Sequence, residues 1–129
     1  MLHRTERNLE NMPVGPLGFI PVDGCQELGK TVDNYLVKWR KEAATNLQDD
    51  VIFHDYLNDT YIVDARVPRF GSGEAKGLIK ESVRGKDVYI MVDVCNYSLT
   101  YTVSGHTNHM SPDDHYQNLK RVIAAIGGK

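Results

Sequence analysis

Residues 24–31, with the sequence GCQELGKT, fit the GxxxxGK[ST] pattern of a phosphate-binding loop. In such a loop Lys30 would contact the β- and γ-phosphates of a nucleotide, and Thr31 would bind a magnesium ion. Asp93 follows an apolar stretch and would be a further metal ligand. The motif therefore raises the hypothesis of a small phosphate-loop NTPase.

Two neighbouring residues oppose this hypothesis. Glu27 would place a carboxylate inside a cradle that has to hold anionic phosphate. Leu28 fits the apolar side of a helix that starts near Cys25, which leaves no room for an eight-residue loop. The pattern favours the first turns of a helix, and the phosphate-loop NTPase stays as the alternative.

The glycine-rich segment at residues 69–74, RFGSGE, is a second candidate site. An exposed Phe70 could stack on a planar base, and Glu74 could accept a hydrogen bond from an amine on that base. The same residues also suit a hairpin turn with a packed phenylalanine. From these residues alone, both interpretations remain open.

The longer run at residues 69–90 resembles the N-terminal domain of the ribose-phosphate pyrophosphokinase (phosphoribosyl pyrophosphate synthetase) family. That family has RFSDGE, then a strand, then ESVRGKDV and an apolar strand, and residues 81–88 here read ESVRGKDV. The segments CQELGKTVDNYL and DDHYQNLKRVIAA are similar to the family's helices NPELAKEIADYL and NDNLMELLIMIDAL. The resemblance covers most of residues 17–129 and puts the GKT of the first motif inside a helix.

This resemblance implies an enzyme that transfers the diphosphate of magnesium-bound ATP to ribose 5-phosphate, giving phosphoribosyl pyrophosphate and AMP. Phe70, Ser72 and Glu74 match the positions that hold the adenine of ATP in a neighbouring subunit's site, so we expect a homo-oligomer. Ser72 replaces an aspartate of the family, which weakens or replaces one hydrogen bond to the adenine. Ser82 and Arg84 match positions of a regulatory phosphate site between subunits, although Arg84 would also suit a solvated turn.

Other parts of the family's machinery have no counterpart here. The family binds ribose 5-phosphate with a strand ending in two aspartates and a TGGT-type loop, and the triphosphate and metal with an Arg-Gln pair and a histidine. Asp113 and Asp114 begin a helix and lack that strand and loop. We therefore expect no catalytic residue and no metal ligand in this chain, which would be the inactive N-terminal domain of a longer, divergent member. A non-catalytic regulatory or assembly module is a further alternative.

A metal site is also conceivable where three histidines lie close in sequence to the two aspartates. His106, His109 and His115 have spacings that match no standard metal motif. A helix cap and polar loops account for these residues, so we expect no metal there.

The alternation of strands and helices predicts an α/β domain, with a mostly parallel sheet flanked by helices in a phosphoribosyltransferase-like arrangement. Strands are expected at residues 16–22, 61–67, 78–83, 88–94 and 97–104, the fourth of them parallel and buried. Helices are expected at about 25–45 and from Pro112 to the double glycine at 127–128, with Ser111 as N-cap. Residues 105–110 are expected as a loop. The expected buried positions of the two helices are Leu28, Val32, Tyr35, Leu36, Trp39 and Ala43, and Tyr116, Leu119, Val122, Ile123 and Ile126.

Composition limits the class of protein. The 129 residues suffice for one domain, for which we expect a loose arm at 1–13 and insertions relative to the family at 46–60 and 97–110. With 15 basic and 17 acidic residues, no basic surface for nucleic acid or anionic membranes is expected.

The chain has no apolar run long enough to span a bilayer and no signal peptide, which predicts a cytoplasmic protein. Cys25 and Cys95 are too isolated for a zinc site, and no disulfide is expected. Because the chain ends directly after its last helix, we expect an incomplete sheet.

Overall fold

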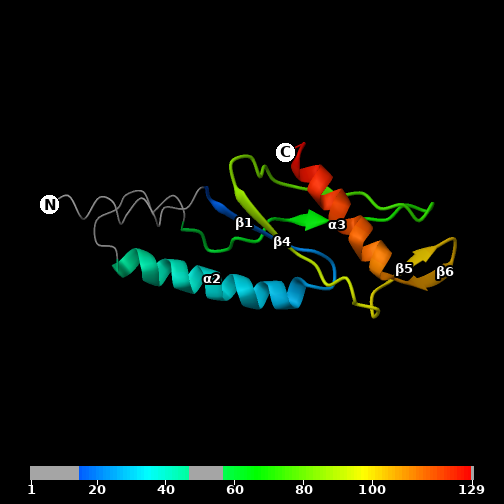
Figure 1. Cartoon of the computed structure of the whole chain (residues 1–129), viewed down its shortest axis with the longest axis horizontal. Helices are drawn as coiled ribbons and strands as arrows, with labels where there is room; N and C mark the ends of the chain where they lie inside the picture. The colour runs from blue at the N-terminus through cyan, green and yellow to red at the C-terminus, as the bar shows by residue number, and fades with distance from the viewer. Residues whose placement is uncertain (1–14, 47–56, 129) are drawn as a thin grey trace.

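The computed structural model describes residues 15–46 and 57–128 (Figure 1). The predicted arm at 1–13, and residues 47–56 of the predicted insertion, lie outside this described part. The elements follow one another as β1 (Leu17–Pro21), α2 (Gln26–Asn46), β2 (Ala65–Arg66), β3 (Leu78–Ile79), β4 (Asp87–Met91), β5 (Thr100–Val103), β6 (His106–His109) and α3 (Pro112–Ile126). No helix of the described part is both long and apolar enough to cross a membrane.

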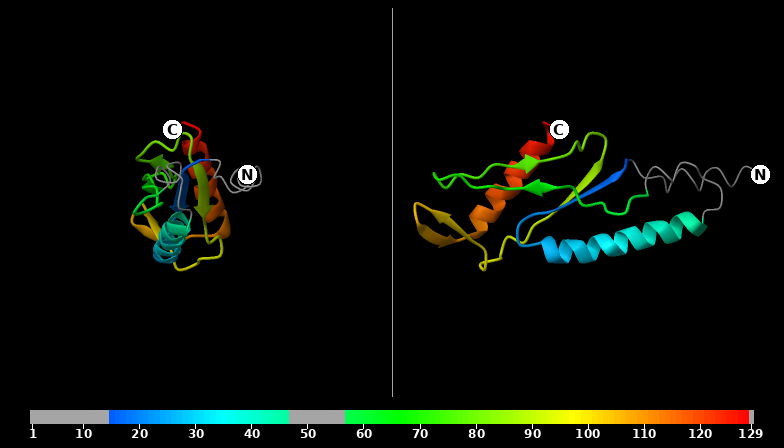
Figure 2. Two further views of the ribbon diagram at one scale, coloured as in Figure 1. Left: turned by 90° about the vertical axis from the view of Figure 1, so that its left-hand side faces the viewer. Right: turned by 180° about the vertical axis from the view of Figure 1, so that it is seen from behind.

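Strand β1 lies in the middle of three parallel segments. On one side it pairs with β4, in a register that runs from Leu17 opposite Asp87 to Pro21 opposite Met91. On the other side Phe19 forms a parallel bridge with Ile62, where the Phe19 amide donates to the Tyr61 carbonyl at 2.7 Å. The parallel pair and the two helices, seen from three directions in Figures 1 and 2, confirm the predicted α/β class.

Two antiparallel hairpins complete the structure. Strands β2 and β3 form the base of a long hairpin, so the strands predicted at 61–67 and 78–83 are shorter than expected. Strands β5 and β6 pair through a two-residue turn at Ser104 and Gly105, which have φ of 50° and 80°, as a type I′ turn requires. The prediction of a loop at residues 105–110 is therefore wrong, because its first four positions after Gly105 form β6.

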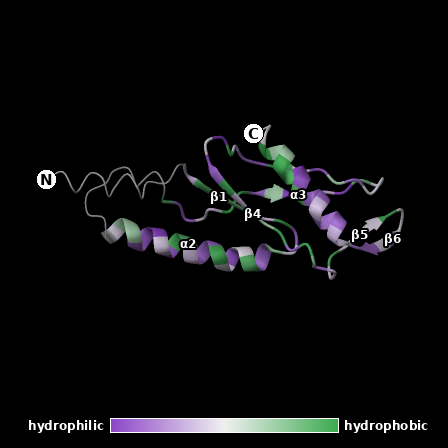
Figure 3. Ribbon diagram, in the orientation of Figure 1, coloured by the Kyte–Doolittle hydropathy of each residue, from purple (hydrophilic) through white to green (hydrophobic). Residues whose placement is uncertain are grey.

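Helix α2 is confirmed, but its buried side differs from the prediction. The side facing the sheet contains Gly29 and the buried carboxylate of Asp33, which accepts from the Tyr61 amide at 2.7 Å. Leu28, Tyr35 and Trp39 are exposed instead, with Trp39 at 59%. Figure 3 shows apolar turns alternating with hydrophilic turns along the visible side of α2.

Helix α3 begins as predicted. The Ser111 hydroxyl accepts from the Asp114 amide at 3.2 Å, and the Asp114 carboxylate accepts from the Ser111 amide at 2.9 Å, which makes a capping box. Its buried residues are His115, Asn118 and Val122, so the predicted burial of Tyr116 and Ile123 is wrong. Both corrections have one physical cause: the apolar positions show that a helix is amphipathic, while close contacts made by small or hydrogen-bonded residues decide which side packs.

The core lies between the sheet, the β2–β3 hairpin and α3. Strand β4 borders it and is only half-buried, with Tyr89 exposed, so the prediction of a strand buried on both faces is wrong. The buried core residues are Ile20, Val22, Val63, Val67, Ala75, Ile79, Val83 and Val122.

Candidate functional site

The RFGSGE segment forms a tight turn at the tip of the β2–β3 hairpin. Arg69 and Ala75 form an antiparallel bridge, and the Phe70 amide donates to the Glu74 carbonyl at 2.7 Å. The Gly73 amide donates back to the Phe70 carbonyl at 2.9 Å, and Gly73 has a φ of +87°. Such a three-residue loop closes with a residue in the left-handed region, which glycine adopts without strain. The hairpin-turn interpretation of this segment is thus confirmed in its backbone.

The side chains of the turn are nevertheless turned outward. Phe70 is 54% exposed, so it is not the packed phenylalanine that the hairpin interpretation assumed. Ser72 is exposed at the tip, and the side chain of Glu74 is 71% exposed, 3.8 Å from Arg121 of α3. The structure therefore brings an accessible aromatic ring, a hydroxyl and a carboxylate together on one short turn, where they could stack on and hydrogen-bond to a flat heterocycle.

Arg69 contacts both the backbone of this turn and the neighbouring strand β5. Its Nη1 donates to the Gly73 carbonyl at 2.7 Å, across the base of the turn. Its guanidinium carbon also lies 4.1 Å from the centre of the Tyr101 ring, in strand β5. Sequence reasoning missed this pair, because a cation–π contact between residues 32 positions apart leaves no local pattern.

Ser82 and Arg84 lie on a different turn, directly before β4. The Lys86 amide donates to the Val83 carbonyl at 3.0 Å, and the Arg84 amide to the Ser82 hydroxyl at 3.4 Å. Within residues 15–46 and 57–128, the guanidinium of Arg84 is exposed and has no hydrogen bond or ion pair. Figures 1 and 2 place this turn and the RFGSGE turn beyond opposite ends of the β2–β3 hairpin, so one chain does not combine them into one pocket.

The phosphate-loop hypothesis is wrong. Helix α2 begins at Gln26, so Lys30 and Thr31 lie in helical turns and not in a loop around a phosphate. The Lys30 ammonium lies 3.1 Å from the carboxylate of Glu27, and the Thr31 hydroxyl donates to the Glu27 carbonyl at 3.2 Å. Asp93 accepts from the backbone amide two residues later, at 3.1 Å.

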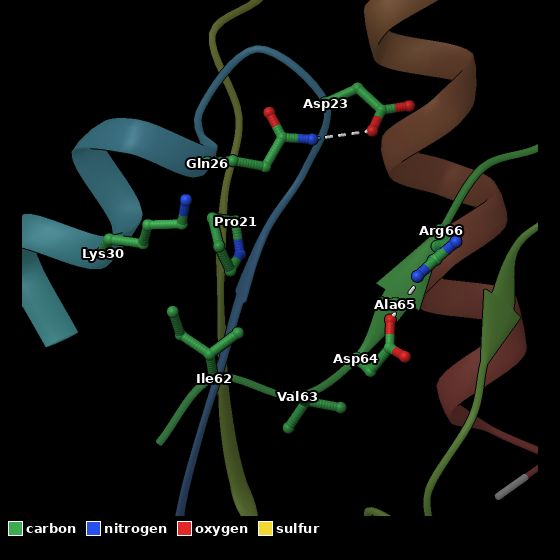
Figure 4. Close-up of a pocket in the computed structure, with 9 residues that line it drawn as sticks. All are labelled: Pro21, Asp23, Gln26, Lys30, Ile62, Val63, Asp64, Ala65 and Arg66. Atoms are coloured by element: carbon green, nitrogen blue, oxygen red, sulfur yellow. Dashed lines mark hydrogen bonds and ion pairs between the residues drawn. The ribbon is translucent and has the colours of Figure 1, made fainter. Parts of the chain in front are cut away.

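A pocket of about 270 Å³ does lie beside this helix start (Figure 4). Its floor is apolar, and its rim carries two cations and two carboxylates. Asp23 accepts a hydrogen bond from Gln26 at 2.9 Å, Arg66 lies 3.5 Å from Asp64, and Lys30 lies 3.1 Å from Glu27, so each charged group of the rim already has a partner. The balanced rim gives no preference for a phosphate. The lining residues are Pro21, Asp23, Gln26, Lys30, Ile62, Val63, Asp64, Ala65 and Arg66.

Two of the three histidines considered as metal ligands have other contacts. His109 stacks on Tyr97 with ring centres 4.4 Å apart, and its Nδ1 lies 2.9 Å from the Tyr97 carbonyl. His115 is buried, with Nε2 2.7 Å from the carbonyl of Asn96. The part of the chain that the structure describes contains no group of three His, Cys, Asp or Glu side chains placed to hold a metal.

The two cysteines are both free, and they differ in environment. Burial raises the pKa of the Cys25 thiol above its usual value; a hydrogen bond with the backbone of Asp93 lowers the pKa in part, and the charge of the Asp93 carboxylate raises it. Cys95 is exposed. A buried thiol with a raised pKa is a poor nucleophile, so Cys25 belongs to the fold and not to a site.

Comparison with known proteins agrees with this arrangement. The family model of the N-terminal domain of ribose phosphate pyrophosphokinase matches residues 19–128. That range includes both helices and both turns described above. Comparisons with curated proteins and with solved structures found no significant match. The match over most of the chain, with the outward-facing RFGSGE turn inside it, shows that the chain belongs to the family of N-terminal domains of ribose phosphate pyrophosphokinase.

Proposed function

We propose that this chain is the adenine-binding N-terminal domain of a cytoplasmic ribose-phosphate pyrophosphokinase. The complete enzyme would transfer the β,γ-diphosphoryl group of ATP to the C1 hydroxyl of ribose 5-phosphate, releasing AMP. The observation that carries the proposal is the exposed Phe70 ring on a turn held by two backbone hydrogen bonds, with Glu74 beside it. A large apolar ring kept accessible on a rigid turn suits a stacking platform.

The three side chains of the turn would divide the recognition of adenine. Phe70 would stack on the base, and Glu74 would accept a hydrogen bond from the exocyclic amine. Ser72 would contribute a neutral hydroxyl where its relatives use a carboxylate, which makes a weaker acceptor for that amine. Because the turn stands at one end of the molecule, it would serve the site of a neighbouring subunit in a homo-oligomer.

The phosphates and the metal would be held outside this turn. Mg²⁺ supplies charge neutralisation at the phosphates during diphosphoryl transfer. The residues of the RFGSGE turn fit the base and offer one carboxylate, so they do not form a metal site by themselves. With no counterpart of the family's ribose 5-phosphate loop in the 129 residues, we propose that the isolated chain binds adenine nucleotide without turnover.

Arg84 and Ser82 would form part of a regulatory phosphate site. The guanidinium of Arg84, which has no partner among the described residues, would be available to bind phosphate oxygens in a bidentate manner. The turn that carries it would lie at a contact between subunits.

The test is ATP affinity of the whole chain, measured by isothermal titration calorimetry with oligomeric state followed by sedimentation. Phe70→Ala is expected to weaken ATP binding by about tenfold, since stacking of a base on an aromatic ring contributes about 1–3 kcal/mol. Lys30→Ala, and Tyr89→Ala as an exposed aromatic control on β4, are expected to leave affinity unchanged. Loss of binding only in Lys30→Ala would overturn the proposal. Unchanged affinity in every variant, with self-association intact, would favour the assembly module.

A further inference from the structure

We infer that the β5–β6 hairpin is a positioning element for the RFGSGE turn, and that Tyr101 is the residue through which it acts. The inference rests on the proposed function, because it assigns a further residue to the same adenine site. Tyr101 would not touch the nucleotide. It would hold Arg69, and Arg69 would hold the turn in the conformation that presents Phe70.

The contacts form a continuous chain from hairpin to turn. The Tyr101 ring lies under the guanidinium of Arg69, at 4.1 Å. The same guanidinium donates to the Gly73 carbonyl at 2.7 Å, and this bond is partly buried. Val103 also reaches the turn, because its Cγ2 would lie 3.5 Å from a β-carbon on Gly73. Both hairpin residues face the turn because they are two positions apart on one strand.

The geometry of Arg69 explains why the ring matters. A guanidinium is flat, so it can stack on an aromatic face while its edge donates hydrogen bonds. Stacked on Tyr101, it is held with one edge toward the Gly73 carbonyl. Without the ring, the long side chain gains rotational freedom that the single hydrogen bond to Gly73 has to offset.

The other end of the turn is more loosely attached. Glu74 lies 3.8 Å from Arg121, and both side chains are solvent-accessible, so this ion pair contributes little. Two backbone hydrogen bonds close the turn itself: the Phe70 amide donates to the Glu74 carbonyl, and the Gly73 amide donates to the Phe70 carbonyl. The Tyr101–Arg69 pair is therefore the principal side-chain support on the hairpin side.

Segment 97–110 is the one that we interpret as an insertion relative to the family. Its exposed strand β6 consists of His-Thr-Asn-His, and its strand β5 turns Tyr101 and Val103 toward the RFGSGE turn. The inference gives this segment a function, namely a fixed orientation of the adenine-binding turn.

The test combines amide hydrogen exchange at the turn with ATP affinity, on the whole chain. In Tyr101→Leu, the amides of Phe70 and Gly73 should exchange about threefold to tenfold faster, and ATP should bind more weakly by a similar factor. The upfield ring-current shift of the Arg69 Cδ protons should also disappear. Tyr101→Phe keeps the ring and should restore all three properties.

Tyr97→Leu is the matched control, because Tyr97 belongs to the same segment but stacks on His109 instead of the turn. It should leave exchange at Phe70 and Gly73 unchanged. Arg69→Lys examines the same link from the turn side, since lysine keeps the charge but not the flat fork, and it should reproduce the faster exchange.

Unchanged exchange in both Tyr101→Leu and Arg69→Lys would overturn the inference, whatever happens to ATP binding. Equal acceleration in Tyr97→Leu would overturn it as well, by showing a general loosening of the hairpin. Failure of the proposed function looks different: Phe70→Ala would then leave ATP affinity unchanged, while the exchange experiment would still decide the role of Tyr101.

Discussion

Gly29 in helix α2 lies directly against Pro21 at the end of strand β1. A β-carbon on Gly29 would lie 2.5 Å from the Cβ of Pro21 and 2.7 Å from its Cγ. The second glycine of the GxxxxGK[ST] pattern is thus a packing residue, which lets the helix approach the strand closely. A sequence pattern associated with nucleotide binding is here satisfied by the requirements of helix–strand contact.

We predict that Gly29→Ala destabilises the protein by about 1–3 kcal/mol, because the proline ring cannot move aside for the new methyl group. The sign of the change in unfolding free energy is informative, since glycine to alanine in a helix without such a contact stabilises by about 1 kcal/mol. Urea unfolding measures the difference. Gly127→Ala is the control: Gly127 has a helical φ of −62° and space for a β-carbon, so a comparable loss of stability there would contradict the explanation.

Ser72→Asp should increase selectivity for adenine. A carboxylate at the tip of the turn would accept a stronger hydrogen bond from the adenine amine than the serine hydroxyl does, so ATP should bind about threefold to tenfold more tightly. GTP should gain nothing, because guanine presents a carbonyl oxygen at the corresponding position. Parallel calorimetric titrations with ATP and GTP check this, and an equal gain for both nucleotides would exclude base recognition by residue 72.

Asp33→Ala should cost about 2–3 kcal/mol of stability. The buried Asp33 carboxylate accepts from the Thr60 hydroxyl at 2.6 Å and from the Tyr61 amide at 2.7 Å, and its removal breaks both hydrogen bonds, the second of them buried. Asp59→Ala is the matched control, since Asp59 is exposed in an ion pair with Lys41 and should change stability by less than about 1 kcal/mol. Equal effects of the two variants in urea unfolding would show that Asp33 does not tie α2 to the sheet.

Stability should fall in alkaline solution because of Cys25. Its thiol has a pKa above the ordinary value of 9.0 in the folded protein, so folding favours the protonated form. The corresponding contribution to stability is complete below about pH 9, the pKa of the unfolded chain, and is lost as the pH rises toward the folded pKa. Cys25→Ala should flatten the fall above about pH 9, while Cys95→Ala should retain it, and a wild-type slope in Cys25→Ala would refute this assignment.

Local signals predicted much of the fold. The Ser111–Pro112 start of α3 depends on the chemistry of helix ends, which acts over four residues. The helix also ends at Gly127 as predicted, although that glycine keeps a helical φ of −62°. The turn at Gly73 is likewise determined locally, because its left-handed backbone follows from the glycine itself. These features were predictable because sequence neighbours alone determine them.

The remaining features of the fold depend on long-range packing, so the sequence did not predict them. The apolar stripe of α2 correctly indicated a helix, yet the side that packs is rotated by roughly a quarter turn toward Gly29 and Asp33. Small residues and buried hydrogen bonds, unlike apolar patterns, reveal their role only once the opposing element is known. Strand β6 was missed because His-Thr-Asn-His has no apolar alternation, although Ser104-Gly105 is a recognisable two-residue turn.

The residues of the candidate site could be predicted from the sequence, but the contacts that hold them in place could not. Phe70, Ser72 and Glu74 could be named from the motif and the resemblance, and the structure places them on one turn. The contact between Arg69 and Tyr101 joins segments far apart in the chain, so only a three-dimensional arrangement could reveal it.

The outward position of Trp39 makes it an intrinsic optical reporter. It is the single tryptophan of the chain, it lies 59% exposed on α2, and the ring of Tyr35 is its neighbour at 5.7 Å. In the folded protein its emission maximum therefore already lies at the long wavelengths typical of an indole in water. Unfolding will shift that emission little, whereas a second molecule covering the outer side of α2 will shift it to shorter wavelengths. Fluorescence of the unmodified protein is thus a poor measure of folding and a direct measure of association at this helix.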